Sequence, residues 1–288
     1  MEIVARGKFR RGKPPVNDGP GRKEMLAGVE VPTDSSGMRR PPPPLTASLV
    51  LVLVLSAVVA LGLAAQRFGW RGMQFDDNLA YDGRFTFARI RYTVYGRSGW
   101  EYDYPTMERN LMTMMAEITA LAPHVRGSNI HTFDDPELLK YPVAYLSEPG
   151  YWLPSDSEVE GLRTYLAKGG FLIVDDFMLQ EWYNFEEQMR RVLPDGRIDR
   201  LDVSHPIFDS FYRVESLDMG YPGRPRLKAE FLGIHQNNDP RQRLMVIINY
   251  NNDIGDYMEH SGQGWWPVNI TNDAYKLAIN YIIYGLTH

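Results

Sequence analysis

Acidic side chains that could bind a metal ion or act as general bases follow two segments predicted to be buried strands. Glu148 follows the apolar residues 142–147, and Asp175 and Asp176 follow residues 171–174. Open α/β sheets place their ligands outside the carboxyl ends of the strands. Glu148 and Asp175 can therefore converge, and two carboxylates with one histidine suit a hard divalent cation. The sequence thus gives Glu148, Asp175 and Asp176 as candidate metal ligands.

Asp175 and Asp176 also suit a structural role. Adjacent residues of an extended chain point to opposite sides, so one carboxylate can face a cleft while the other caps the following helix. Aspartate is frequent at helix caps and in turns, and no spacing in this chain matches a known metal-binding loop. Both interpretations stay open at this point.

His205 and His260 are the candidate catalytic bases. His205 precedes Pro206 in a predicted loop, and His260 follows Glu259 in a loop rich in glycine and asparagine. Histidine titrates near neutral pH, although a lone histidine is more often a hydrogen-bonded structural residue. Asp253 lies in the same late loop and, like Glu259, is a candidate for the binding cleft.

Paired aromatic residues form a second kind of candidate site. Amphipathic rings at a rim commonly stack on sugars or on a partner protein. The alternative is that these rings close the core over the sheet. The candidates are Tyr151, Trp152, Trp182, Trp265 and Trp266.

Composition excludes several kinds of chemistry. The chain has no cysteine, which removes disulfides, thiolate metal sites and cysteine nucleophiles. It has no phosphate loop, GxGxxG or GxSxG motif, and we expect no cofactor. Residues 75–288 contain 31 Asp and Glu against 20 Lys and Arg. An acidic surface repels phosphate backbones, so nucleic-acid binding is disfavoured.

Alternating strands and helices must position these side chains. The expected strands are residues 85–95, 142–147, 171–174, 227–234 and 244–250, and the expected helices are residues 107–122, 155–168, 180–193 and 274–286. Ser155 and Glu158 form a capping box at the start of the second helix. Alternation in the first half indicates parallel pairing with right-handed crossovers, and the shorter late connections predict an antiparallel edge. Residues 84–288 are therefore predicted to form a three-layer, flavodoxin-like α/β domain.

Residues 45–65 form an apolar run with no charged residue. A helix of this length spans the ~30 Å hydrocarbon core of a bilayer. Residues 1–44 hold nine Lys and Arg against five Asp and Glu and lack hydrophobic periodicity. We therefore expect a disordered basic tail in the cytoplasm, one transmembrane helix at residues 45–66, a linker at 67–83 and the domain outside the cytoplasm.

A cleaved signal peptide is the alternative to this membrane anchor. Small residues at Ala64 and Ala65 would suit a cleavage site, and translation from Met38 would give a compact signal sequence. Cleavage would release a secreted or periplasmic domain.

Several separated motifs occur in one order through the domain. They are EYDYP at residues 101–105, ERNL at 108–111, DDPEL at 134–138, LRTYL at 162–166, GGFLIVDD at 169–176, HPIF at 205–208, DIG at 253–255 and LAINYIIY at 277–284. Together they resemble the domain of unknown function 4159 family of bacterial proteins, over nearly all of residues 84–287.

The resemblance implies a class I glutamine amidotransferase-like fold, which is flavodoxin-like, in proteins that are often exported. It also implies envelope protein partners, because relatives can occur near MoxR-type ATPases and von Willebrand factor A proteins. Amidotransferases of this fold use a cysteine on a strand-to-helix turn, where this chain has Asp175, Asp176 and Phe177. Their thiol chemistry is therefore excluded. The family has no established reaction from which catalytic residues could be assigned.

Two functions follow as hypotheses. The first is a membrane-anchored or exported, non-catalytic binding or scaffold module of a cell-envelope complex. The alternative is a metal-assisted hydrolase acting on an envelope substrate, with Glu148, Asp175 and Asp176 as ligands and His205 or His260 as the base.

Overall fold

Seven strands form one mostly parallel sheet in the computed structural model of the protein, which describes residues 75–94 and 99–288. Across the sheet the order is β2 (Asn129–His131), β1 (Ala88–Ile90), β3 (Val143–Ser147), β4 (Phe171–Phe177), β9 (Leu244–Tyr250), β8 (Glu230–His235) and β5 (Asp199–Arg200). The first five strands in this order pair in parallel, whereas β8 pairs antiparallel with both β9 and β5. The predicted α/β class, with a parallel centre and an antiparallel edge, is confirmed.

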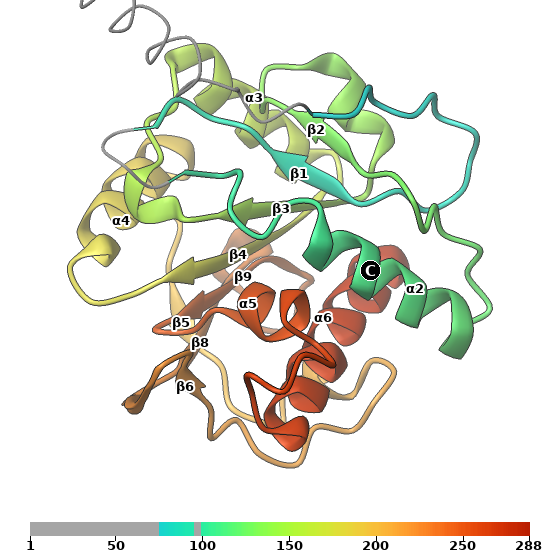
Figure 1. The fold of residues 1–288 in the computed structure, drawn as a ribbon. Helices are drawn as coiled ribbons and strands as arrows, with labels where there is room; N and C mark the ends of the chain where they lie inside the picture. The colour runs from blue at the N-terminus through green and yellow to red at the C-terminus, as the bar shows by residue number, and fades with distance from the viewer. Residues whose placement is uncertain (1–74, 95–98) are drawn as a thin grey trace, which may run out of the picture. The chain divides into compact units, whose positions relative to one another are not determined.

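Helices cover both faces of this sheet (Figure 1). One face packs against α2 (Thr106–Ile118), α5 (Ile254–Glu259) and α6 (Val268–Thr287), and the other against α3 (Asp156–Ala167) and α4 (Glu181–Val192). Each face has its own apolar core. The short elements are η1 (Pro136–Lys140), η2 (Pro149–Tyr151), η3 (Pro206–Asp209), η4 (Gln236–Asn238), β6 (Gly220–Tyr221) and β7 (Arg224–Lys228).

The central strands are buried along their whole length. Every residue of β3 and β4 is buried, as expected for parallel strands covered by helices on both sides. The predicted capping box begins α3: the Ser155 hydroxyl accepts from the Glu158 backbone N–H at 3.2 Å, and the Glu158 carboxylate accepts from the Ser155 N–H at 2.8 Å. Because β4 is buried to its end, the carboxyl groups of Asp175 and Asp176 belong to buried residues.

Strand β1 and helix α6 differ in length from the prediction. β1 covers three residues of the predicted 85–95, and β2, which is also three residues long, was not predicted. A strand this short cannot display an alternating pattern. α6 begins at Val268 directly after Pro267, six residues before the apolar stripe that predicted it.

The N-terminal predictions fall largely outside the described residues. Neither the tail at 1–44 nor the apolar run at 45–65 is described, and among residues 75–94 and 99–288 no helix combines the length and apolarity needed to cross a bilayer. Part of the predicted linker packs on the domain. The Asn78 side chain donates to the Ile130 carbonyl at 2.9 Å, and the Leu79 N–H donates to the Asn129 side chain at 2.7 Å.

A buried ion pair joins β1 to α2. Arg89 is fully buried, and its Nε donates to Oε1 of Glu108, which is also buried. The Arg89 Nη1 donates to the carbonyl oxygens of Trp100 at 2.7 Å and Tyr102 at 2.9 Å. One guanidinium therefore fixes a strand, a helix and the loop before that helix.

Replacing Arg89 by methionine tests the weight of this contact. The change leaves the Glu108 carboxylate buried without its cation, so we expect Arg89→Met to lower the free energy of unfolding by about 3–5 kcal/mol. The matched control is Arg190→Met, which removes the exposed Arg190–Glu186 pair of α4 and should cost about 0.5 kcal/mol or less. Urea unfolding measures both, and equal losses would contradict the assignment.

A second buried contact joins two histidines at the amino end of β9. The Nε2 atoms of His205 and His235 lie 3.2 Å apart, and His235 pairs with Leu244, the first residue of β9. Burial lowers the pKa of His205 to about 4, with His235 adding to this effect, and burial also lowers the pKa of His235. Asp202 and His288 act on the first ring, and Asp199, Arg197 and Asp239 act on the second ring.

This pair predicts an acid-sensitive contribution to stability. A histidine with a folded-state pKa below its ordinary value of about 6.5 binds protons more readily in the unfolded chain. Its stabilising effect is therefore complete above pH 6.5 and declines as the pH falls towards about 4. We expect His205→Asn, which can still cap η3 but does not titrate, to lose less stability over this range than the parent. Parallel pH profiles from urea unfolding would contradict the prediction.

Candidate functional site

Three carboxylates from distant parts of the chain meet at the carboxyl end of the parallel strands. One oxygen from each of Asp103, Asp176 and Asp253 lies within 4.8 Å of the others. Asp103 lies in the loop before α2, Asp176 is the penultimate residue of β4, and Asp253 lies between β9 and α5. We call these three residues the carboxylate cluster.

Irregular backbone turns Asp176 into the cluster. The register between β4 and β9 shifts after Val174, and Asp176 has a φ of 61°. Its Oδ1 accepts from the Tyr221 hydroxyl at 3.0 Å, and its Oδ2 accepts from the Ser147 hydroxyl at 3.4 Å. The carboxylate is thus held by two hydroxyl groups, with no cationic partner among the described residues.

Left-handed backbone recurs around the cluster. Asp103 has a φ of 62°, Glu148 a φ of 53° and Asn251 a φ of 54°. Residues other than glycine adopt this region infrequently, and such positions concentrate at functional sites. The Tyr92 hydroxyl donates to the Glu148 carbonyl at 2.7 Å and helps to hold that turn. Together with Asp176, four positions at one end of the sheet therefore adopt a backbone conformation that residues other than glycine seldom take.

Gly255 leaves room beside two of the carboxylates. A Cβ atom at this position would lie 2.7 Å from Asp103 Oδ2, 2.9 Å from the Tyr145 hydroxyl and 3.4 Å from Asp253 Oδ1. Asp103 Oδ2 is buried and has no hydrogen-bond partner among the described residues. Asp253 Oδ1 accepts from the Asp256 N–H at 2.8 Å and caps α5. The absence of a side chain at Gly255 thus keeps this space open.

Asp175 lies beside the cluster and is fully hydrogen-bonded. Its Oδ2 accepts from the Tyr145 hydroxyl at 2.8 Å and the Gly255 N–H at 3.0 Å. Its Oδ1 accepts from the Asn249 side chain at 2.9 Å and the Ile254 N–H at 3.3 Å. The two adjacent aspartates therefore have different surroundings: Asp176 joins the cluster, and Asp175 fixes the start of α5.

Burial raises the pKa of every cluster member. Burial is the largest cause for Asp103, whose pKa rises to about 8, although Arg89 opposes the rise. Burial and the neighbouring carboxylates hold the pKa of Asp176 and of Asp253 well above the ordinary range. The negative form of the cluster therefore requires a compensating positive charge. Three oxygen ligands at this separation fit a hard cation such as Mg²⁺, Ca²⁺ or Mn²⁺.

A second group of possible ligands follows along α5. Ligand atoms of Asp256, Glu259 and His260 also lie within 4.8 Å of one another. His260 Nε2 lies 3.2 Å from Asp256 Oδ1 and 3.6 Å from Glu259 Oε2. The imidazole stacks on the Trp265 ring, with 3.9 Å between ring centroids. Glu259 interacts with Asp103 and helps to raise the pKa of that carboxyl group, so the two groups adjoin.

Two further predicted residues lie in different parts of the fold. Glu148 follows β3 as expected, and its carboxylate is close enough to Asp176 to raise the pKa of that residue. His205 contacts His235 at the amino end of β9, opposite the carboxylate cluster. The structure therefore brings Glu148 to the site and separates His205 from it.

The predicted aromatic residues do not gather at one rim. Trp152 is completely buried, and Trp182 packs against Phe177 and Tyr250. Trp265 is 62% exposed, whereas Trp266 makes an edge contact with Tyr257. Core closure, the alternative interpretation, thus describes Trp152, whereas Trp182 packs on the core and is partly exposed. Among the four tryptophans only Trp265 presents a largely exposed ring.

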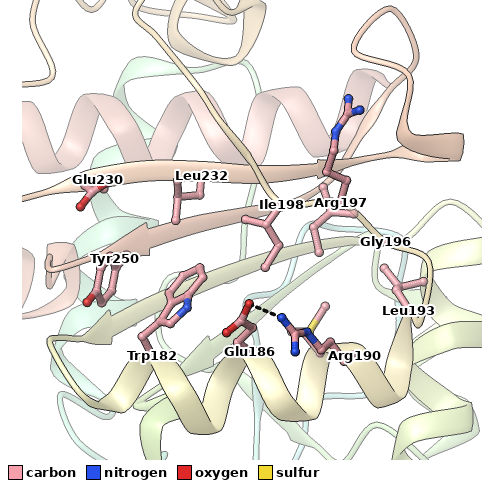
Figure 2. A pocket seen from close by; sticks show the side chains of 12 residues that line it. Trp182, Glu186, Arg190, Leu193, Gly196, Arg197, Ile198, Glu230, Leu232 and Tyr250 are labelled. Carbon is pink, nitrogen blue, oxygen red and sulfur yellow. Dashed lines mark hydrogen bonds and ion pairs between the residues drawn. The ribbon is translucent and has the colours of Figure 1, made fainter.

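A separate hollow of about 510 Å³ lies between α4 and the antiparallel strands. Figure 2 shows Trp182, Leu232 and Tyr250 lining it, together with the Glu186–Arg190 ion pair of α4. It includes no member of the carboxylate cluster. The hollow and the acidic site are therefore different features of the molecule.

Sequence reasoning missed Asp103 and did not single out Asp256 within the late loop. Asp103 belongs to a loop that returns to the sheet through contacts with Arg89, and no spacing links it to Asp176 or Asp253. The only sequence signal was the acidic EYDYP motif at residues 101–105. Asp256 lies within the late acidic loop, where α5 was not predicted.

Comparisons with known proteins identify a family without assigning a reaction. No curated protein matches the chain. A family model described as a domain of unknown function, DUF4159, matches residues 86–286, which includes every member of the carboxylate cluster. The chain therefore belongs to the DUF4159 family.

Proposed function

We propose that this domain binds a hard divalent cation through Asp103, Asp176 and Asp253 and uses it for metal-assisted hydrolysis. The observation that supports the proposal is the convergence of three carboxylate oxygens within 4.8 Å. Two oxygens that bind one Ca²⁺ at about 2.4 Å can be at most about 4.8 Å apart, and each pair of these oxygens meets that limit.

Access and neighbouring groups favour chemistry over a purely structural ion. Asp103 is only partly buried, and Glu259 and His260 lie beside it at intermediate exposure. A bound divalent cation supplies Lewis acidity and lowers the pKa of a coordinated water. The chain itself supplies a carboxylate and an imidazole next to that position, which are groups suited to metal-assisted chemistry.

We also infer that the fold is flavodoxin-like, in agreement with the resemblance to class I glutamine amidotransferases. The order β2-β1-β3-β4-β9 follows the 2-1-3-4-5 arrangement of that fold, whose ligands bind at the carboxyl ends of the strands. Asp176 then occupies the strand-end turn where an amidotransferase would carry its cysteine. A carboxylate at this point suits cation binding and not thiol chemistry.

A non-catalytic binding module is the second candidate function. The exposed Trp265 ring, stacked on His260 at the border of the acidic site, favours it. An envelope protein or a glycan would be the ligand in this case, because amphipathic rings contact both.

The proposed location is outside the cytoplasm. It rests on the apolar residues 45–65 and the basic residues before them. The envelope complexes suggested by the family resemblance, with MoxR-type ATPases and von Willebrand factor A proteins, belong to the same proposal.

Cation binding predicts a gain in stability that is lost when one carboxylate of the cluster is replaced by an amide. Mn²⁺ at about 100 times its Kd should stabilise the EDTA-stripped protein by about 2.7 kcal/mol, because only the folded state has the site. Asp253→Asn keeps the cap on α5 but should abolish this gain. In EDTA the variant should unfold at the same or a higher temperature than the parent, because the amide removes like-charge repulsion.

The matched control is Asp77→Asn, which makes the same change at an exposed position and should retain the full response to Mn²⁺. Thermal unfolding with Mn²⁺, Mg²⁺ and Ca²⁺ measures these effects, and no response to any cation would refute the proposal. The same preparations, assayed on p-nitrophenyl acetate and bis-p-nitrophenyl phosphate, separate the two functions. Cation binding without cleavage of either ester would favour the binding module.

Export predicts where the full chain is found. In a bacterial host it should sediment with membranes after a carbonate wash, and protease added to spheroplasts should digest its domain. A variant that lacks residues 1–66 should remain soluble inside the cell. A soluble, shortened product in the periplasm would identify the apolar run as a signal peptide, and an intact, soluble cytosolic chain would contradict export.

A further inference from the structure

The residues along α5 provide ligands that the cation proposed above does not use. Asp256 and His260 are four residues apart, so they face the same side of one helical turn. His260 Nε2 lies 3.2 Å from Asp256 Oδ1 and 3.6 Å from Glu259 Oε2. Cis ligand atoms in an octahedral complex with bonds of about 2.2 Å are about 3.1 Å apart, so these separations match one shared ion.

Packing holds this group in place without completing its hydrogen bonding. The Asn110 side chain donates to the carbonyl oxygens of Met258 at 2.9 Å and Glu259 at 3.2 Å, which ties the end of α5 to α2. The Trp265 ring covers the imidazole of His260. His260 Nδ1 is buried and has no partner among the described residues, whereas Nε2 faces the two carboxylates and is the ring nitrogen in position to bind a cation with them.

Charge balance points the same way. The cluster members and the α5 carboxylates Asp256 and Glu259 lie together, and the cationic side chains beside them are Arg89 and His260. Arg89 already pairs with Glu108. When these groups are ionised, one divalent cation balances only two of the five carboxylates, and a second cation would favour the ionised form over the protonated one.

We propose that Asp256, Glu259 and His260 bind a second divalent cation next to the first, so that the site is binuclear. This inference rests on the proposed function, because the first ion occupies the carboxylate cluster. Glu259 would hold the second ion beside Asp103, which would hold the first, because these two carboxyl groups adjoin. An imidazole ligand makes the second position suited to Mn²⁺ or Zn²⁺, whereas the all-oxygen first position suits Mg²⁺, Ca²⁺ or Mn²⁺.

A pair of adjacent ions indicates a substrate class. Two divalent cations about 3.5–4 Å apart clamp the attacking and leaving oxygens of a phosphoester in many hydrolases. The proposed substrate is therefore a phosphate ester. Trp265 stands at the border, where its exposed ring can contact the organic part of such a substrate.

Counting bound Mn²⁺ in the full chain, purified in detergent and freed of metal, tests the second ion. Elemental analysis after equilibrium dialysis should give two ions per chain for the parent and one for His260→Gln. Electron paramagnetic resonance should show a spin-coupled pair in the parent and an uncoupled Mn²⁺ signal in the variant. His124→Gln, a change at a histidine that pairs with Asp82, should retain two coupled ions.

The outcomes separate this inference from the proposed function. One Mn²⁺ per chain in both the parent and His260→Gln would overturn the second ion and leave the first intact. No bound Mn²⁺ in the parent would overturn both. Two ions without spin coupling would overturn the binuclear arrangement. If His260→Gln fails to fold in EDTA, Asp256→Asn provides the same count, because it removes another ligand of the second ion only.

Discussion

Burial of like charges at the carboxyl end of the sheet is the constraint on which the rest of the structure depends. A buried carboxylate must be protonated, hydrogen-bonded or paired with a cation, because its transfer from water is otherwise too costly. The protein uses different solutions within a few residues. Glu108 pairs with Arg89, and Asp175 accepts four hydrogen bonds. Asp103, Asp176 and Asp253 have neither solution in full, which distinguishes them from the carboxylates that only support the fold.

The contrast between Asp175 and Asp176 shows how the backbone makes this distinction. In a regular strand the two side chains would face opposite layers of the domain. Asp175 does so, and its oxygens meet Tyr145 and the first N–H groups of α5. At Asp176 the left-handed φ and the shifted register redirect the side chain towards the strand ends. A single local irregularity therefore converts a buried strand residue into a member of the acidic site.

The sequence predicted those parts of the site that follow from strand geometry. Glu148, Asp176 and Asp253 were found because parallel strands end at one edge of the sheet, a rule that requires no tertiary information. Asp103 was missed because its position depends on contacts of its loop with Arg89, a residue inside a strand only three residues long. His205 does not join the cluster because β8 runs antiparallel, which brings its partner His235 to the opposite edge. Pairs of aromatic letters likewise could not distinguish the buried Trp152 from the exposed Trp265.

The same packing that buries the carboxylates also links the site to the elements that carry them. Arg89 holds the loop of Asp103 against β1, Asp175 holds the start of α5 against β4, and Asn110 holds the end of α5 against α2. When the cluster is ionised, mutual repulsion acts against each of these contacts, so the fold keeps ionised carboxylates together only at the expense of its own stability. Natural proteins retain such a conflict chiefly where function requires it. A cation between the carboxylates converts repulsion into attraction across all three elements, which is why cation binding and the rigidity of this end of the sheet are expected to be coupled.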